Sequence, residues 1–429
     1  MKSKLAIFGG PKVRKNPFPK HPVIEDVEKK AVIEVLNKGN LSTFIASPGE
    51  YFLGGEKIKE FEEAFKKYIN SKYAISLNSA TAGLHAAIAA AYIGPGDEVI
   101  VPPYTFTSTA TCALMNSAIP VFVDIDPDTF CIDPEKINEA ITPRTKAIIP
   151  VHLFGLPADM NPIMEIAENN DLVVIEDVAQ APGAKYKGNL AGTIGDFGVF
   201  SFTESKTITT GEGGMVITDD EEFAERVRMV RNHGEVITDS SHRDYISNLI
   251  GWNYRMTEIS AALGIVQLKK LDMLNKMRIG LANYLIKKIS KFEGFTPQLT
   301  KPSLTNVYYV VAFKYDEDKI GISRDLFVKA LNAEGIPFSL GYVPPLYWSP
   351  IYQEKKGFGR TNWPFEWMSY KSNINYDKGI CPVTERLYEK ELMLIGVCRY
   401  PATKQDMDDI VKGIEKVLEN VDILKKHNK

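Results

Sequence analysis

Short apolar runs alternate with longer amphipathic stretches over the first two thirds of this 429-residue chain. Each apolar run has the length of a buried strand, and the runs lie at 73–78, 98–102, 120–126, 147–152, 172–175 and 197–202. The stretches at 25–38 and 56–68 instead carry apolar residues at helical spacing. Strands that alternate with helices build a mostly parallel sheet with helices on both faces. The pattern therefore predicts an α/β fold.

The alternation ends near residue 275, beyond which helical stretches surround a separate strand-like run at 307–313. A chain of this length is too long for one small core and fits two domains. We therefore expect an N-terminal arm and helix over 1–55, a large domain over 56–274 and a smaller α+β domain over 275–429.

The overall charge and the cysteines restrict the partners and the chemistry. The formal net charge is −3, so there is no electrostatic case for binding nucleic acid or a membrane surface. Four cysteines and six histidines are scattered without the spacing of a disulfide framework or a metal site. The N-terminal apolar run is too short for a signal peptide, and no run approaches membrane-spanning length. We expect a cytoplasmic protein without a bound metal.

Reactive side chains gather in one stretch near the middle of the chain. The run 172–175 leads to Asp177 at a strand end, where open α/β sheets place their ligands. Lys206 follows about thirty residues later, shortly before the glycine-rich 211–214. Pyridoxal phosphate requires a lysine amine for a Schiff base and a carboxylate that keeps its ring nitrogen protonated. An Asp and a Lys in isolation are more often a strand cap and a solvated lysine.

Three motifs in this stretch follow one another in order: E-D-x-A-Q, F-S-F-x-x-x-K and G-E-G-G. Together they resemble the DegT/DnrJ/EryC1/StrS aminotransferases. This family is the sugar and cyclitol branch of the fold-type-I, aspartate aminotransferase-like pyridoxal phosphate enzymes, and the resemblance covers nearly the whole chain. K-L-A-I-F-G-G-P-K-V near the N-terminus and C-P-V-T-E at 381–385 are similar to the subgroup of inosose aminotransferases and aminohydroxybenzoate synthases.

The resemblance implies roles for the residues around the cofactor ring. Lys206 would be the catalytic residue, which holds pyridoxal 5′-phosphate as a covalent Schiff base and moves the proton during transamination. Asp177 would keep the ring nitrogen charged, and Gln180 would hydrogen-bond the phenolic oxygen of the ring. Phe106 would stack on the ring face.

A second group of residues is expected at the cofactor phosphate. Ser79, Ala80 and Thr81 open a helix after a strand, and N–H groups at a helix N-terminus bind phosphate. Ser and Thr at such a place are also ordinary helix caps. The resemblance adds Ser201 and, from the neighbouring subunit, Asn253 of the G-W-N-Y-R-M segment. It thereby implies a homodimer with two shared active sites.

The implied reaction moves an amino group from glutamine or glutamate to a ketone on a sugar or cyclitol, in amino-sugar, aminocyclitol or surface-glycan biosynthesis. Nucleotide-linked keto-sugars and inosose-type rings both fit, and the subgroup motifs favour the cyclitol. Two alternatives stay open. Some keto-sugar dehydratases of the same fold replace the Schiff-base lysine, which this chain keeps as Lys206. A non-catalytic regulator would be expected to have lost Asp177, Gln180 or Lys206.

Three further features have structural explanations beside the functional ones. We expect His152 to be structural rather than a catalytic base. Pro182 stands where many relatives carry histidine, and we interpret it as subgroup variation. The segment 341–377 holds three of the four tryptophans and suits a sugar ring, a packed loop or a dimer contact.

Overall fold

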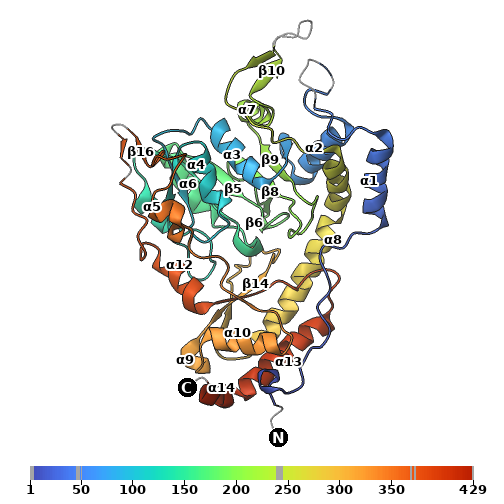
Figure 1. The fold of residues 1–429 in the computed structure, drawn as a ribbon, viewed down its shortest axis with the longest axis vertical. Coiled ribbons are helices and arrows are strands. Elements are labelled where there is room, and N and C mark those ends of the chain that lie inside the picture. The colour runs from blue at the N-terminus through green and yellow to red at the C-terminus, as the bar shows by residue number, and fades with distance from the viewer. Residues whose placement is uncertain are drawn as a thin grey trace.

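The structure, a computed structural model, has a larger and a smaller body that one long helix, α8 (Glu258–Ile289), connects (Figure 1). It describes residues 4–44, 49, 51–237, 245–367, 370–371 and 373–427. Both described ends of the chain lie at the smaller body, at the bottom of Figure 1.

A seven-stranded sheet forms the centre of the larger body. Its strands stand in the order β1 (Tyr73–Leu77), β9 (Gly214–Thr218), β8 (Phe197–Ser201), β5 (Val173–Asp177), β4 (Thr145–Ile148), β2 (Glu98–Val101) and β3 (Ile119–Phe122). Only β9 runs antiparallel to its neighbours, β1 and β8. The expected mostly parallel sheet is confirmed. Because β1 runs in the same direction as the remaining strands, the carboxyl ends of all strands except β9 meet at one edge.

Alternate residues of the strands pack against helices on opposite faces of this sheet. Val99 and Val101 belong to the apolar cluster under α3, α4 and α7, whereas Ile100 between them joins the cluster on the other face. That other face is covered by α2, α5, α6 and the first half of α8. The helices of this body are α1 (Asp26–Lys38), α2 (Glu56–Ile69), α3 (Ala80–Ala90), α4 (Ser108–Met115), α5 (Pro134–Ala140), η2 (Leu153–Gly155), α6 (Met160–Asn170) and α7 (Glu221–Arg231). The short strands around it are β6 (Lys185–Tyr186), β7 (Asn189–Leu190), β13 (Leu304–Thr305), β10 (Glu235–Ile237) and β11 (Tyr245–Ser247).

The smaller body is a four-stranded antiparallel sheet with helices, as the α+β pattern predicts. Its strands stand in the order β12 (Phe295–Pro297), β14 (Val311–Tyr315), β18 (Leu392–Ile395) and β15 (Ser339–Leu340). Its helices are α9 (Glu317–Ile320), α10 (Arg324–Ala333), α13 (Lys404–Glu419) and α14 (Val421–His427). The strand expected at 307–313 begins only at Val311, because the preceding residues form a loop toward the larger body. There Val307 N donates a hydrogen bond of 3.0 Å to Gly155 O.

The predicted division at residue 274 lies inside α8, which continues through it without a break. Leu271 packs in the larger body, and Leu281 and Leu285 pack in the smaller one. Much of the segment from 341 to 391 also returns to the larger body. Its elements are η3 (Leu346–Trp348), α11 (Pro350–Gln353), β16 (Glu366–Trp367), β17 (Tyr370–Lys371), α12 (Pro382–Arg386) and η4 (Leu387–Glu391).

Several aromatic residues of this returning segment pack against the larger body. Tyr347, Tyr352 and Tyr376 are buried around Phe122 at ring-centroid distances of 5.0–5.7 Å. Trp363 Nε1 donates a hydrogen bond of 2.9 Å to Ser117 Oγ. Of the three interpretations of this segment, the packed loop therefore describes these four aromatic residues.

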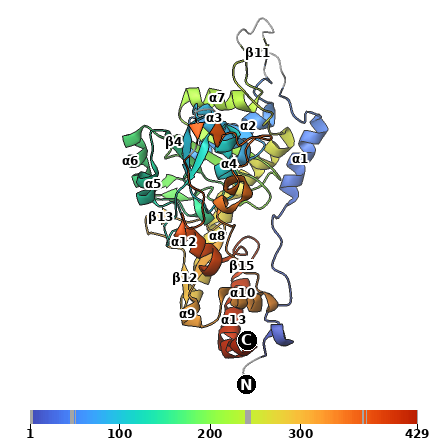
Figure 2. The same cartoon turned by 60° about the vertical axis from the view of Figure 1, so that its left-hand side comes forward.

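The N-terminal arm connects both bodies. Leu5, just before η1 (Ala6–Phe8), is buried in the core of the smaller body. The buried Glu334 carboxylate accepts a hydrogen bond of 2.7 Å from Ala6 N and pairs with Lys416 Nζ at 2.8 Å. The arm then crosses to the larger body, where α1 stands at its outer edge (Figures 1 and 2).

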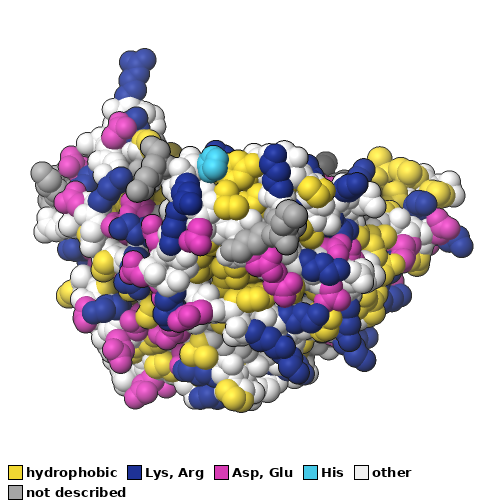
Figure 3. Space-filling view, turned by 90° about the horizontal axis from the view of Figure 1, so that it is seen from below, with side chains coloured by type: hydrophobic (Ala, Val, Ile, Leu, Met, Phe, Trp, Pro, Cys, Tyr) yellow, Lys and Arg dark blue, Asp and Glu magenta, His cyan; other side chains and the backbone are white. Residues whose placement is uncertain are grey.

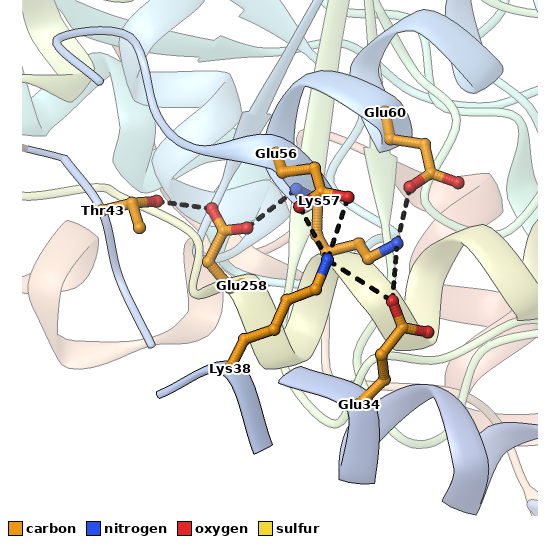
Figure 4. Close-up of polar contacts among 7 residues, drawn as sticks. All are labelled: Glu34, Lys38, Thr43, Glu56, Lys57, Glu60 and Glu258. Carbon is orange, nitrogen blue, oxygen red and sulfur yellow. Dashed lines mark hydrogen bonds and ion pairs between the residues drawn. The ribbon is translucent and has the colours of Figure 1, made fainter. Parts of the chain in front are cut away.

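A polar network joins α1, α2 and the start of α8 (Figure 4). The buried Glu258 carboxylate accepts hydrogen bonds from Thr43 Oγ1 at 2.6 Å and from Lys57 N at 2.8 Å. Lys57 Nζ pairs with Glu60 at 2.8 Å, and Lys38 pairs with Glu56 at 2.9 Å. The exposed pairs contribute little stability, because solvent screens their charges. The buried Glu258 holds α8 in place just after the segment that contains Asn253.

On the face shown in Figure 3, basic and acidic side chains are interspersed with hydrophobic ones. None of the helices in the described ranges is both long and apolar enough to cross a membrane. Within those ranges, no three His, Cys, Asp or Glu side chains gather as a metal site would need. The four cysteines are buried and form no disulfide.

Candidate functional site

A cavity of about 610 Å³ opens at the edge where the carboxyl ends of β1, β5 and β8 meet. All of the predicted site residues except Asn253 line it: Ser79, Ala80, Thr81, Phe106, Asp177, Gln180, Ser201 and Lys206. The parallel strands bring them together, because each strand ends at the same edge.

Asp177 is the last residue of β5 and lies buried at the cavity. Its Oδ2 accepts a hydrogen bond of 2.9 Å from Thr109 Oγ1, and its Oδ1 accepts one of 3.1 Å from Ala179 N. Burial raises the pKa of this carboxyl above its ordinary value, although both hydrogen bonds and Lys206 act in the opposite direction. A cation beside Asp177 would compensate the buried charge.

Lys206 follows β8, and its ammonium lies over the ring of Tyr309, with Nζ 4.6 Å from the ring centroid. The Lys206 backbone is held on both sides. Its N–H donates to Thr203 O at 2.9 Å, and its carbonyl accepts a hydrogen bond of 3.0 Å from His21 Nε2 of the N-terminal arm. The amine therefore projects into the cavity from a fixed backbone and is not a solvated loop lysine.

The N-terminus of α3 forms another side of the cavity. Ser79 caps the helix, and its Oγ accepts a hydrogen bond of 3.1 Å from Ala82 N. Gly214 lies directly behind this turn, where a Cβ would stand 2.4 Å from the carbonyl carbon of Ser79 and 2.7 Å from Ala80 N. Gly214 of the glycine-rich stretch thus allows β9 to approach the start of α3 closely. The cap and the anion-binding geometry coexist at this helix start.

Gln180 is fixed by hydrogen bonds at both ends of its amide. Its Oε1 accepts a hydrogen bond of 2.8 Å from Phe154 N, and its Nε2 donates a hydrogen bond of 3.0 Å to Tyr342 Oη. Burial raises the pKa of the Tyr342 phenol, so this hydroxyl stays protonated. Tyr342 and Val343 are the residues of the 341–377 segment that line the cavity.

Phe106 and Asn253 are the two predicted residues with large exposed surface. Phe106 lines the cavity and is 57% exposed, so much of its ring surface is open. Asn253 does not line the cavity of its own chain and is exposed. Its carbonyl accepts a hydrogen bond of 3.3 Å from Asn78 Nδ2, next to the Ser79 cap. Its side chain is therefore presented at the outer surface near the α3 N-terminus.

Three residues in or directly behind the cavity had no role assigned from the sequence: Tyr309 and Tyr342 line it, and the buried Thr109 lies behind Asp177. Thr109 supports Asp177, Tyr309 underlies Lys206, and Tyr342 holds Gln180. Thr109 ends the polar stretch 103–109. Nothing in the local sequence pattern indicates that its hydroxyl contacts Asp177. Tyr309 and Tyr342 lie 103 and 136 residues beyond Lys206 in the chain.

Two motif segments have structural roles. His152 is buried. Its Nε2 donates a hydrogen bond of 2.8 Å to Glu176 Oε2, and its Nδ1 accepts a hydrogen bond of 3.0 Å from Ala158 N. It does not line the cavity, as expected of a structural histidine. In the C-P-V-T-E segment, Thr384 Oγ1 donates a hydrogen bond of 2.7 Å to the buried Asp124. This bond anchors α12 beyond the end of β3. Outside these two segments, the Pro182 carbonyl accepts a hydrogen bond of 2.8 Å from Asn275 Nδ2.

Comparison with known proteins agrees with this geometry. The pattern of the DegT/DnrJ/EryC1/StrS aminotransferase family matches residues 34–415. An L-glutamine:2-deoxy-scyllo-inosose aminotransferase of Streptomyces kanamyceticus is 34% identical, over 98% of both chains. A GDP-perosamine synthase of Caulobacter vibrioides is 39% identical over 77% of this chain and 85% of its own. The crystal structure of 3-amino-5-hydroxybenzoic acid synthase superposes with a TM-score of 0.81 at 26% identity, covering 95% of this chain and all of that one.

Proposed function

Because the chain belongs to the DegT/DnrJ/EryC1/StrS aminotransferase family, we propose that it moves an amino group from glutamine or glutamate to a ketone on a sugar or cyclitol ring. Family membership makes it a pyridoxal-phosphate-dependent aminotransferase of fold type I. One observation carries the assignment. Asp177, Lys206 and the N-terminus of α3 line a single cavity at the carboxyl edge of the sheet.

The residues in this cavity fit pyridoxal phosphate. The α3 N-terminus and Ser201 offer donors to the phosphate, as a helix N-terminus does for anions generally. The buried Asp177 carboxylate, which lacks an ion-pair partner among the described residues, suits a protonated ring nitrogen. Phe106 has open ring surface for stacking on the cofactor ring, and Gln180 offers its amide to the phenolic oxygen.

When bound, this cofactor supplies an electron sink for negative charge on the carbon beside the transferred nitrogen. Asp177 keeps a proton on the ring nitrogen, and Thr109 keeps Asp177 ionised by donating to it. Lys206 Nζ would take the proton from Cα of the amino donor as a general base and would deliver it, as a general acid, to C4′ of the cofactor. Tyr309 holds the lysine amine in the cavity by its ring face.

The ring that receives the amine is proposed to be an inosose-type cyclitol. The Streptomyces relative is an inosose aminotransferase by name, whereas the Caulobacter relative is named for a nucleotide-linked sugar. The N-terminal and C-P-V-T-E motifs favour the cyclitol. Incubation with L-glutamine and a panel of inososes and nucleotide-linked keto-sugars should give an aminated cyclitol by mass. Amination of the nucleotide-linked sugars alone would move the assignment to them.

We further propose a homodimer in which Asn253 of each chain reaches the cofactor phosphate of the other. The exposure of Asn253 beside the α3 N-terminus supports this arrangement. A cytoplasmic location stays a prediction.

Lysine attachment of the cofactor is tested by chemical labelling. Borohydride reduction of the purified yellow protein should fix pyridoxal on Lys206, as a peptide map would show. Lys206→Ala should bind the cofactor without a covalent link and lose transamination by a factor of about 100 or more, because the proton-moving amine is absent. Lys187→Ala, at an exposed lysine, is the matched control and should be labelled like the parent. A label on another lysine would contradict the assignment.

Asp177→Asn should keep the cofactor and lose activity by about 100-fold or more. The amide has nearly the shape of the carboxylate but cannot hold the ring nitrogen proton by charge. Activity and cofactor content should be measured on the same sample, so that loss of cofactor is separated from loss of catalysis. Turnover within about twofold of the parent would remove Asp177 from this role.

A further inference from the structure

The segment that carries Asn253 turns its neighbouring side chains toward the interior of the larger body. Asn253 forms a β-bridge with Asn232 at the end of α7, so the chain is extended there. Side chains alternate between the two sides of an extended segment, and Trp252 and Tyr254 therefore lie on the side opposite Asn253. Both rings are half-buried against the apolar cluster around α3, whereas Asn253 is exposed. The segment thus presents Asn253 outward from an anchored base.

His85 of α3 contacts both of these flanking rings. The rings of Trp252 and Tyr254 stack at a centroid distance of 6.0 Å and an angle of 10°. The fully buried His85 ring meets them edge-on, with its centroid 4.6 Å from that of Trp252 and 5.9 Å from that of Tyr254. His85 Nδ1 lies 2.9 Å from Tyr254 Oη, at hydrogen-bond distance. A buried hydrogen bond of this kind is costly to break, so it fixes the Tyr254 ring.

Main-chain hydrogen bonds hold the same segment at its two ends. Trp252 N donates a hydrogen bond of 2.8 Å to Val230 O, and Tyr254 O accepts one of 2.9 Å from Asn78 N. These bonds set where the segment lies. The contact between Tyr254 and His85 lies on the side of the segment opposite Asn253. It therefore sets how the segment is rotated about its own length, and with this rotation the direction in which Asn253 projects.

The amide of Asn253 is oriented as a donor. Its Oδ1 accepts a hydrogen bond of 3.4 Å from Arg255 N. The other end of the amide, Nδ2, is the donor that a phosphate oxygen requires. A rotation of the segment would move this donor away from its target, because a hydrogen bond weakens steeply with angle and distance.

Helix α3 connects the two places where a chain is proposed to contact a cofactor phosphate. Ser79 caps its N-terminus, which faces the cavity of its own chain. His85 lies in the same helix, six residues further on, and holds the segment that offers Asn253 to the other chain. Neither His85 nor Tyr254 lines the cofactor cavity. Any effect of these two residues on the cofactor must therefore act through other residues.

We propose that His85 and Tyr254 are positioning residues, which hold Asn253 in the direction needed to reach the cofactor phosphate of the partner subunit. This inference rests on the proposed function, because it requires the shared active site. Tyr254→Phe is the most conservative test, since it removes the hydroxyl and keeps the ring that stacks on Trp252.

Binding of two probes with and without a phosphate tests the proposal without turnover. Equilibrium dialysis of the full-length protein should show that Tyr254→Phe binds pyridoxamine 5′-phosphate about 3- to 10-fold more weakly than the parent, as expected for one weakened hydrogen bond. Pyridoxamine, which lacks the phosphate, should bind to the parent and to Tyr254→Phe equally. An equal loss for both probes, or no loss for either, would overturn the proposal.

A matched control and a second variant accompany this measurement. Tyr284→Phe also removes a tyrosine hydroxyl, which donates a hydrogen bond of 2.8 Å to Asp408 in the smaller body. It should bind both probes like the parent. His85→Leu removes the other partner of the Tyr254 hydroxyl and should show the same phosphate-selective loss. A selective loss in Tyr284→Phe would show that the effect is not specific to the segment around Asn253.

A double-mutant cycle with Asn253→Ala separates this inference from the proposed function. Asn253→Ala should weaken binding of pyridoxamine 5′-phosphate about 10- to 100-fold, because a hydrogen bond to a charged group is lost. Adding Tyr254→Phe should weaken it no further, because its only route to the phosphate is gone. Losses that multiply would overturn the positioning role alone. An Asn253→Ala variant that binds like the parent would contradict the shared site and, with it, this inference.

Mixed dimers show in which chain the tyrosine acts. In a dimer of Tyr254→Phe with Lys206→Ala, purified by a different tag on each chain, the site that keeps Lys206 receives Asn253 from a chain with an intact Tyr254. The pyridoxal phosphate concentration that half-restores activity should therefore return to the parent value, whereas in the Tyr254→Phe homodimer it should be raised about 3- to 10-fold. A value that stays raised in the mixed dimer would mean that Tyr254 acts within its own site, which contradicts the proposal.

Discussion

Thr109 Oγ1 donates a hydrogen bond of 2.9 Å to Oδ2 of Asp177, and thereby joins the first turn of α4 to the end of β5. The Thr109 hydroxyl also lies 3.1 Å from Thr105 Oγ1. Burial alone favours the neutral form of Asp177, and the role proposed for Asp177 requires the charged form. Thr109 is therefore a positioning residue that keeps the carboxylate ionised.

Thr109→Val should lower activity by about 10-fold at the acidic end of the pH range, because valine has the shape of threonine without the donor. Loss of the hydrogen bond raises the pKa of Asp177, so the acidic limb of the pH–rate profile should move to higher pH. Thr109→Ser keeps a hydroxyl and should keep the parent profile. A uniform loss at all pH values would indicate a packing defect instead.

Gly214→Ala should weaken cofactor retention and lower the melting temperature. The new Cβ would stand 2.4 Å from the Ser79 carbonyl, which should move the start of α3 and the N–H groups proposed to bind the phosphate. Cofactor content after dialysis measures the effect. Gly211→Ala is the comparison: its φ of +82° strains the backbone, but no atom lies within 4 Å of the added carbon. Equal cofactor loss in both variants would show that strain, rather than the clash at Ser79, is responsible.

Refolding two inactive variants together tests the shared active site. Lys206→Ala lacks the amine, and Asn253→Asp places a negative charge where the phosphate of the other chain is expected. In a mixed dimer, one site carries both defects and the other carries neither. Random pairing should restore about a quarter of the parent activity, from one intact site in half of the dimers.

Each variant alone is the control for this experiment and should be inactive. Mixed dimers can be identified by tagging one chain. If tagged mixed dimers form without regaining activity, or if Asn253→Asp alone is fully active, Asn253 does not serve the partner's site.

His85 should make stability depend on pH. Its ring is fully buried in α3, with Nδ1 2.9 Å from Tyr254 Oη, and burial lowers its pKa from 6.5 to about 4. Below about pH 6.5 His85 binds a proton in the unfolded chain, whereas in the folded chain it stays neutral until about pH 4. The free energy of unfolding should therefore fall as the pH decreases across this window, by up to about 3 kcal/mol from this residue.

Urea unfolding of the parent and His85→Asn at several pH values isolates this contribution. The variant should be less stable at pH 8, because a smaller side chain fills the site. Its free energy of unfolding should fall less steeply between pH 6.5 and 4, because the residue that titrates there is gone. Parallel profiles for the two proteins would contradict the assignment to His85.

The sequence by itself determined the mostly parallel sheet with helices on both faces, and it predicted residues that the structure brings to one cavity. Apolar runs of strand length, alternating with helical stretches, can bury both of their faces only in a parallel sheet covered by helices. In such a sheet the strand ends meet at one edge, so Asp177 and Ser201 were expected at the same edge, whereas the pairing of β5 with β8 came from the structure. A helix cap such as Ser79 depends only on neighbouring residues, so it can be predicted from the local sequence.

Only the tertiary structure decided which residues support that site. Tyr309 reaches Lys206, and Tyr254 meets His85, across more than 100 residues of chain, and no periodicity encodes such a meeting. The same holds for the strand expected at 307, which begins at Val311 because the preceding loop binds the larger body. The course of α8 through residue 274 likewise follows from the two cores on which its halves pack. Local patterns specify elements, whereas contacts between distant elements depend on how their surfaces fit when packed.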